Sequence, residues 1–247
     1  MNKKLTIITI NYNNLEGLKR TVESVMNQTI REFEYVVIDG GSIDGSAEYL
    51  ETQSKNFDYW VSEPDKGIYN AMNKGVAKAT GEYLLFLNSG DRLVADDAVL
   101  YKLIPKLVSK VVYYMPIYKE YSSEIILENY PNKIDNNFIF NRSLCHQAII
   151  YSFKCFVDFN FDEKLKFIAD WEFNYKVIKK GIKFEKLQNP LVIYDMFGLT
   201  SIKETQKLAF EEKYFLKINQ YYKEYVFYKY KRKIESLFFK IIRKVIK

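Results

Sequence analysis

The sequence is poor in the residues that build disulfide scaffolds and metal clusters. Its 247 residues include two cysteines, Cys145 and Cys155, and one histidine, His146. No C-x-x-C pair is present, so a structural zinc site is not expected. Residues 1–4 lead directly into an alternating strand pattern and not into the apolar core of a signal peptide. We therefore expect a cytoplasmic, reducing compartment in which both thiols are free.

Long hydrophobic runs are also missing. No apolar stretch approaches the ~18 to 20 residues that a membrane-spanning helix needs. The net charge is +6, but residues 229–247 alone carry eight basic side chains and one acidic one, so the rest of the chain is slightly acidic. This distribution, together with the lack of a recognition motif, argues against nucleic acid as a partner.

The basic tail has an apolar side. Hydrophobic residues recur there at steps of three and four, and lysines and arginines cover the remaining positions. Such a pattern predicts an amphipathic helix that lies on an anionic membrane surface. A helix docked on its own domain, or one that self-associates in a homodimer, is the alternative. The apolar positions are Ile234, Leu237, Phe238, Ile241, Ile242 and Val245.

The first half of the chain alternates between strand and helix patterns. This alternation predicts an α/β fold with a mainly parallel, Rossmann-like sheet flanked by helices. Polar turns at 11–14, 39–46 and 88–91 follow three of the predicted strands, and ligands bind at that edge of such sheets. The predicted strands are 5–10, 33–38, 59–61 and 83–87, and the predicted helices are 15–28, 47–53 and 69–79.

The second half is less regular. We divide the chain into a domain at 1–200, with a nucleotide-sugar half at 1–100 and an acceptor half at 101–200, and a helical extension at 201–247. The pattern from Glu204 onward is helical to the end of the chain. The predicted strands of this half are 111–118, 124–127, 145–151, 182–187 and 191–194, and a helix is predicted at 170–180.

Five ordered motifs resemble the family 2 glycosyltransferases, which have the GT-A fold. They lie at 6–13, 23–29, 37–46, 62–75 and 79–91. The branch that the chain is most similar to makes bacterial surface polysaccharides, namely capsule, exopolysaccharide and O-antigen. The resemblance implies an inverting hexosyltransferase that uses a nucleotide-sugar donor. It also implies a saccharide acceptor, with a lipid-linked one expected, and a place on the inner face of the plasma membrane.

The resemblance implies that Thr9, Tyr12 and Asp39 bind the nucleotide. A tyrosine at a strand end can stack on a base, and a carboxylate can accept the imide proton of uracil, which favours a UDP-sugar. Asp39 is alternatively a turn-forming residue before Gly40. Lys66 is either a point charge for the diphosphate or a solvated turn lysine. Asn73 is expected near the donor.

The segment 88–91 occupies the family's metal-binding position, which normally reads Asp-x-Asp or Asp-x-Asp-Asp. Here Asn88 and Gly90 replace two carboxylates, and Asp91 remains as the charged ligand. A hard cation such as Mg²⁺ or Mn²⁺ can still bind through one carboxylate, diphosphate oxygens and water. Asn88 and Ser89 are expected to contact the donor. The alternative is a tight turn without a metal.

The resemblance places the catalytic base at Asp170, where the family has Glu-Asp and this chain has Ala169-Asp170. Asp170 is alternatively a helix N-cap, and Glu172 is the reserve candidate. We place His146, Gln147, Trp171 and Glu172 on the acceptor side. A lone histidine is more often structural than catalytic, and Trp171 is also expected to pack.

Two other classes of protein remain open at this point. One is a nucleotidyltransferase, although residues 11–14 lack the glycine-rich basic signature that usually follows its first strand. The other is a catalytically silent protein that binds a nucleotide sugar, which the substitutions Asn88 and Gly90 favour.

Overall fold

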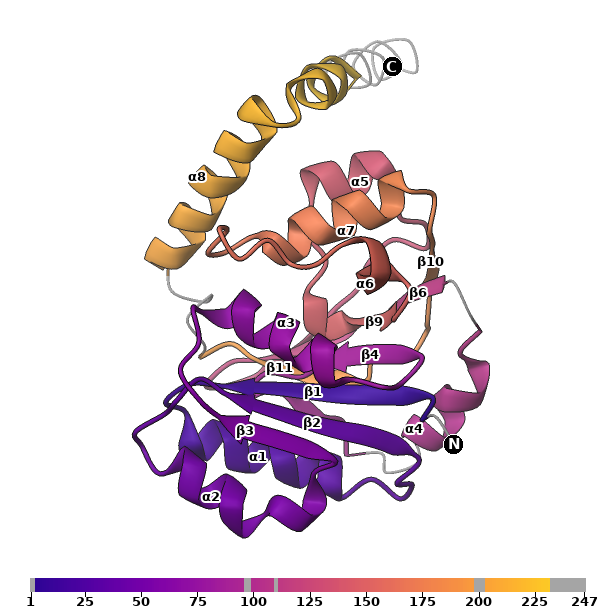
Figure 1. Ribbon diagram of the computed structural model, residues 1–247. Coiled ribbons are helices and arrows are strands. Elements are labelled where there is room, and N and C mark those ends of the chain that lie inside the picture. The colour runs from indigo at the N-terminus through magenta and orange to yellow at the C-terminus, as the bar shows by residue number, and fades with distance from the viewer. Residues whose placement is uncertain (1–2, 96–98, 109–110, 198–202, 232–247) are drawn as a thin grey trace.

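A seven-stranded sheet forms the centre of the computed structural model, which describes residues 3–95, 99–108, 111–197 and 203–231 (Figure 1). Its strand order is β10-β6-β9-β4-β1-β2-β3, and β9 alone runs antiparallel to its neighbours. The mainly parallel α/β sheet is confirmed. Its strands are β1 (Leu5–Asn11), β2 (Phe33–Asp39), β3 (Tyr59–Ser62), β4 (Tyr83–Phe86), β6 (Val111–Tyr114), β9 (Ile149–Ser152) and β10 (Lys183–Lys186).

Helices cover both faces of this sheet. Every residue of β1, β2 and β4 is buried, as expected for central strands of a sheet that is covered on both faces. In Figure 1, α1 (Leu15–Met26) and α2 (Ser46–Thr52) lie on one side of the sheet and α3 (Ile68–Lys78) lies on the other. The Asn14 side chain caps α1 by accepting a bond from the backbone N–H of Gly17.

A second, four-stranded sheet has the order β5-β11-β7-β8. It corrects the prediction of one strand at 111–118, because that segment is divided between the two sheets. Pro116, which lacks an N–H donor, stands at the break between β6 and β7. The predicted strand at 145–151 is also corrected, since it begins as a 3₁₀ turn, His146–Ala148. The second sheet contains β5 (Arg92–Leu93), β7 (Ile117–Glu120), β8 (Ile125–Glu128) and β11 (Val192–Asp195).

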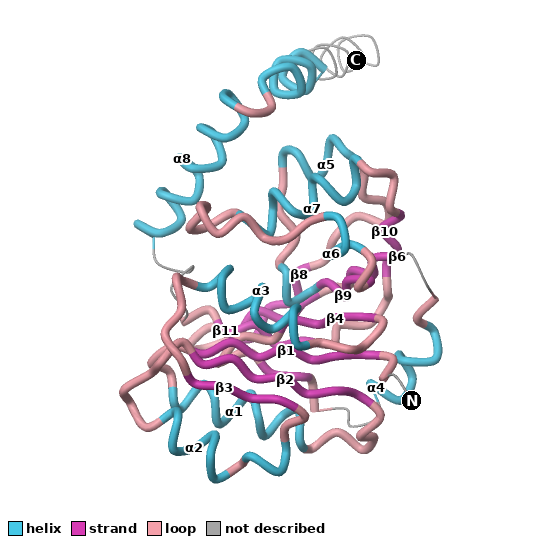
Figure 2. Tube along the Cα trace, in the orientation of Figure 1, coloured by secondary structure: helices cyan, strands magenta, loops and turns pink. Residues whose placement is uncertain are grey.

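The C-terminal helices pack beside this body (Figures 1 and 2). The predicted continuous helix is interrupted at Gln220 and Tyr221, after which residues 222–231 are helical again. Tyr221 and Tyr228 are buried, so this part of the extension is docked. The predicted amphipathic face at 234–245 lies outside the described residues. The remaining helices are α4 (Val99–Leu103), α5 (Asn136–Asn141), α6 (Cys155–Asp158), α7 (Ala169–Lys179) and α8 (Lys203–Asn219), with further 3₁₀ turns at Ser54–Asn56 and Ile104–Lys106.

Across the described ranges, no helix has both the length and the hydropathy of a membrane span. Cys145 and Cys155 are both free thiols, as expected.

Candidate active site

The polar turns that follow β1, β2 and β4 meet at one edge of the large sheet, as the strand pattern predicts. Asn11 ends β1 and Asp39 ends β2, and the two are register partners. The Asn11 amide nitrogen donates to Oδ1 of Asp39 over 2.7 Å. Asn14 joins the third turn, because its amide nitrogen donates to the carbonyl of Ser89 over 3.1 Å. The site therefore lies at the carboxyl ends of the strands.

Asp39 is the centre of a filled hydrogen-bond network. It is fully buried, and in addition to Asn11 it accepts bonds from the Ser42 hydroxyl, the Ser42 backbone N–H and the Ser62 hydroxyl. A carboxylate has about four acceptor positions, so these bonds occupy them. A nucleobase therefore reaches the Asp39 carboxylate only by displacing one of these donors.

Two further residues that the sequence predicts near the nucleotide make contacts inside the protein. Thr9 is fully buried, and its hydroxyl is bonded to Tyr35 Oη at 3.1 Å instead of facing the edge of the sheet. Asn73 holds the backbone of Phe161 through both ends of its amide and also donates to Glu163. Asn73 therefore ties α3 to the segment before α7.

Tyr12 is an exposed aromatic residue at this edge, with 65% of its surface accessible. The Asp65 carboxylate lies beside it over Gly40. A Cβ added at Gly40 would stand 2.4 Å from Asp65 Oδ2 and 3.1 Å from Tyr12 Cδ2. The exposed Lys66 follows in the same turn. An aromatic ring and a carboxylate thus lie side by side at this edge, and an exposed lysine follows them in the turn.

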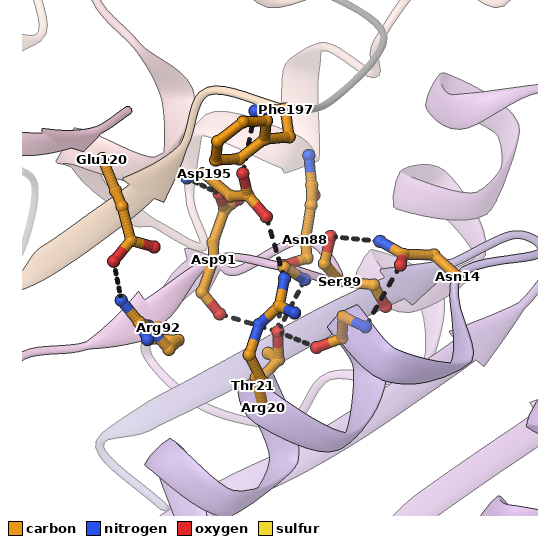
Figure 3. A network of polar contacts seen from close by, with 12 residues as sticks. Asn14, Arg20, Thr21, Asn88, Ser89, Asp91, Arg92, Glu120, Asp195 and Phe197 are labelled. Carbon is orange, nitrogen blue, oxygen red and sulfur yellow. Dashed lines mark hydrogen bonds and ion pairs between the residues drawn. The ribbon is translucent and has the colours of Figure 1, made fainter. Parts of the chain in front are cut away.

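The turn after β4 is held in place by buried polar contacts (Figure 3). The Thr21 hydroxyl donates to the carbonyl of Asp91 over 2.7 Å and accepts from the Gly90 N–H at 2.9 Å. Gly90 has a φ of +105°, a conformation that side chains other than glycine rarely adopt. The turn is consequently fixed in one shape before any ligand binds.

Asp91 is buried, with 3% of its surface accessible. Its Oδ2 accepts from the Gln147 amide over 2.9 Å, and its Oδ1 accepts from the Asp195 backbone N–H over 3.0 Å. Burial raises the pKa of Asp91 to about 7, although these two hydrogen bonds act in the opposite direction. A carboxylate in such a place gains stability when a cation binds next to it.

The donor atoms of this turn suit a hard divalent cation in part. Oδ1 of Asn88 and Oγ of Ser89 are buried without a hydrogen-bond partner, and both are oxygen ligands of the kind that Mg²⁺ and Mn²⁺ accept. Within the described ranges, however, no three His, Cys, Asp or Glu side chains gather closely enough to hold a metal. The arrangement fits a cation that arrives with a diphosphate better than one that is bound beforehand.

A chain of polar side chains connects this turn to Asp170. The Asn88 amide nitrogen lies 3.1 Å from His146 Nε2, and His146 Nδ1 lies 3.3 Å from Asp170 Oδ2. Because an amide nitrogen only donates, Nε2 accepts and Nδ1 carries the proton towards Asp170. The Tyr69 hydroxyl donates to Asp170 Oδ1 over 3.2 Å. Burial and the Asp170 carboxylate raise the pKa of Tyr69 well above its usual value, so Tyr69 remains a donor.

Asp170 is not the cap of α7. The helix begins at Ala169 after Ile168, and Asp170 Oδ1 accepts from the backbone N–H of the next residue, Trp171, over 2.8 Å. The alternative structural interpretation of Asp170 is therefore wrong. Three donors converge on its carboxylate, and 15% of its side chain is accessible.

The other residues predicted on the acceptor side occupy different positions. Gln147 is 2% exposed and holds Asp91. Trp171 is 1% exposed, and its indole nitrogen donates to the carbonyl of Ile139 over 2.6 Å, so it packs and does not line a cleft. Glu172 is buried against the C-terminal extension, where it accepts from Tyr221 over 3.0 Å. Glu172 therefore holds the extension in place, and its role as a reserve base stays a prediction.

Sequence reasoning missed Arg20, Tyr69 and Asp195. Tyr69 lies inside one of the five motifs but next to no recognised catalytic pattern. Asp195 ends β11, so the rule that selected the turn after β4 also applies to it. Arg20 lies on the exposed side of α1, and only its 3.0 Å ion pair with Asp195 reveals its position at the site.

The glycosyl transferase family 2 model matches residues 6–165, which is more than half of the chain. The chain belongs to this family. The predicted family is thereby confirmed, and the match covers all five motifs.

Two relatives and one solved structure show how far the similarity extends. An uncharacterized glycosyltransferase of Mycobacterium tuberculosis is 50% identical over 96 residues, or 38% of this chain and 37% of that protein. A PGL/p-HBAD biosynthesis glycosyltransferase of Mycobacterium bovis is 28% identical over 190 residues, or 73% of this chain and 72% of the relative. The match to the first relative thus spans about a third of its length.

The structure of Staphylococcus aureus TarS 1–349 in complex with UDP-GlcNAc superposes with a TM-score of 0.64. The two chains share 20% sequence identity, and the superposition covers 78% of this chain and 58% of TarS. The predicted GT-A fold is confirmed.

Proposed function

We propose that the protein transfers a sugar from a nucleotide-sugar donor, specifically a UDP-sugar, to a saccharide acceptor with inversion at the anomeric carbon. The observation that carries this proposal is the chain Asn88–His146–Asp170, because it joins the donor turn to a carboxylate that can serve as base. Family membership and the TarS complex with UDP-GlcNAc support the donor class.

The nucleotide lies over the edge formed by β1, β2 and β3. Tyr12 stacks on the base, which its exposed ring permits, and this contact tolerates any base. Asp65 and Lys66 flank it. Asp39 shapes the floor through Asn11, Ser42 and Ser62, and it accepts the uracil imide only if a serine hydroxyl moves away.

The departing diphosphate lies beside the turn after β4. We assign Asn88, Ser89 and Asp91 to a divalent cation, Mg²⁺ or Mn²⁺, that binds together with the diphosphate. When bound, the cation neutralises the charge that develops on the leaving group. The unpartnered oxygens of Asn88 and Ser89 and the buried Asp91 carboxylate support this assignment.

Asp170 accepts the proton of the acceptor hydroxyl as that oxygen attacks the anomeric carbon. The new carbon–oxygen bond forms while the bond to the diphosphate breaks, and the diphosphate leaves with the electron pair. His146 and Tyr69 hold the Asp170 carboxylate in one orientation. Such a base gains from being fixed before the acceptor arrives.

We place the protein on the inner face of a bacterial plasma membrane, in the synthesis of a surface polysaccharide on a lipid-linked acceptor. The basic apolar pattern of residues 229–247 supports this part of the proposal. A homodimer is the alternative role for that segment.

A silent binding protein is the competing function, because the described residues hold no group of three metal-ligating side chains. A thermal-shift screen of UDP- and GDP-sugars, followed by an assay of diphosphate release with Mn²⁺, separates the two. A bound ligand at a hundred times its Kd stabilises by about 2.7 kcal/mol. We expect a UDP-sugar to stabilise the protein and to be consumed. Stabilisation without any consumption or transfer would establish the silent protein instead.

A further inference from the structure

Asp195, at the end of β11, lies against the turn after β4 from the other sheet (Figure 3). Its backbone N–H donates to Asp91 Oδ1, and its own Oδ1 accepts from the Phe197 N–H over 2.8 Å. Its other oxygen, Oδ2, points back towards the turn, and 13% of the side chain is accessible. A second carboxylate therefore stands beside Asp91.

The position of Asp195 is related to a gap in the sequence motif. The turn has Gly90 where the family's motif carries a carboxylate. A Cβ placed on Gly90 would lie 2.9 Å from Asp195 Oδ2 and 3.4 Å from Asp195 Cβ. The carboxylate of Asp195 thus fills the space that a side chain at residue 90 would enter. The carboxylate that the turn after β4 lacks is thus present at the same place as the side chain of Asp195, at the end of β11.

The positive charge next to the Asp195 carboxylate comes from Arg20. Its Nη2 lies 3.0 Å from Asp195 Oδ2, and 47% of its side chain is accessible. A pair that is half exposed on one side contributes little to stability, so a divalent cation can replace the guanidinium at low cost. The oxygen that Arg20 contacts is the one that faces Gly90.

We propose that Asp195 is a second carboxylate ligand of the cation that accompanies the diphosphate, and that Arg20 occupies its place until the cation binds. The inference rests on the proposed function, since it requires a cation at Asp91. Two carboxylates and a diphosphate form an oxygen ligand set typical of Mg²⁺ or Mn²⁺. The cation and Arg20 compete for Asp195, because the oxygen that would face the cation, Oδ2, pairs with the guanidinium in the structure.

This competition predicts that substitutions of Asp195 and of Arg20 change the affinity for Mn²⁺ in opposite directions. Manganese binding is followed by electron paramagnetic resonance of free Mn²⁺ in the presence of UDP, with no sugar and no acceptor. Asp195→Asn is expected to weaken Mn²⁺ binding about tenfold or more. Arg20→Met is expected to strengthen it severalfold, because it removes the competing charge. If the ion pair were purely structural, both substitutions would change the affinity for Mn²⁺ in the same direction or would leave it unchanged.

The nearby pair Arg92–Glu120 offers a matched control, since its 2.7 Å ion pair also involves the second sheet. Arg92→Met and Glu120→Gln should leave Mn²⁺ binding unchanged. Unchanged binding in Asp195→Asn, or weaker binding in Arg20→Met, would overturn the inference. If Asp195→Asn does not fold, Arg20→Met alone decides the matter. A wild-type protein that binds neither UDP nor Mn²⁺ would instead contradict the proposed function.

Discussion

The two halves of the molecule build their parts of the site in different ways. In the first half, the donor edge is formed by consecutive turns after β1, β2 and β4, each within a local motif. In the second half, His146, Asp170 and Asp195 come singly from a 3₁₀ turn, a helix and a strand. Local sequence therefore suffices for the donor edge, whereas the reacting end depends on how distant elements pack.

The halves also differ in how their acidic residues are held. Asp39 is enclosed by donors from its own half and has no free acceptor position. Asp170 receives donors from Tyr69 in the first half and His146 in the second. From this difference we expect Asp39 to matter for the stability of the fold and Asp170 for the rate of transfer.

The largest expected effect is that of Asp170→Asn. Removing the base should lower sugar transfer by about 10² to 10⁴-fold, while UDP affinity and thermal stability stay near wild type. Transfer kinetics and UDP calorimetry on the same sample check both parts. Asp158→Asn, which changes an exposed carboxylate paired with Lys180, is the control and should be silent. Loss of UDP binding in Asp170→Asn would contradict the assignment of donor binding to the first half and of the reaction to the second.

Asp39→Asn should act on stability first. The new amide group faces donors from Ser42 and Ser62, so at least one charge-assisted bond becomes a donor–donor contact. We expect a loss of about 2 kcal/mol in the free energy of unfolding, measured by urea denaturation. A variant of wild-type stability that no longer binds UDP would show instead that Asp39 acts directly on the nucleotide.

His146→Ala tests the connection between the halves. The histidine positions Asp170 and contacts Asn88, so its removal should lower the transfer rate by about ten- to a hundredfold, or ~1.4 to 2.7 kcal/mol in activation free energy. The KM for the donor should change little. His146→Gln retains a donor and should recover part of the rate, and a failure to do so at full stability would argue for a direct chemical role.

Tyr12→Ala should weaken UDP binding by about 1 kcal/mol without changing stability, because the ring is exposed. Calorimetry with UDP, and with GDP for comparison, measures this loss. Tyr12→Phe keeps the ring and should bind as well as wild type. If Tyr12→Ala binds UDP as tightly as the wild type does, the nucleobase lies elsewhere on the edge of the sheet.

The last prediction concerns the C-terminal extension and the way its stability depends on pH. Burial lowers the pKa of Lys213 to about 7, while the unfolded chain keeps its ordinary value near 10.5. Between these values the unfolded state binds more protons, so Lys213 makes stability increase with pH, by at most about 1.4 kcal/mol per pH unit. Lys213→Met should flatten the wild-type profile between pH 7 and 9. A profile that does not change would mean that Lys213 is solvated.

The sequence predicted the parallel sheet and the meeting of polar turns at one of its edges, because buried strands and their terminal turns are local features. It did not predict that Pro116 divides a strand between two sheets, since either sheet can accept the same apolar pattern. It did not predict the hydrogen bonds of Thr9 with Tyr35 and of Glu172 with Tyr221, because these partners are distant in sequence. The backbone N–H of Asp195 donates to the side chain of Asp91, 104 residues away, and no local pattern links the two.

The most direct test is ³¹P NMR of the wild-type protein and Asp170→Asn with a UDP-sugar, Mg²⁺ and a lipid-linked saccharide extract. We predict that both proteins broaden the UDP-sugar signals to the same extent and that only the wild type converts them to those of UDP. Binding without conversion by the wild type, or equal conversion by both proteins, would contradict the account.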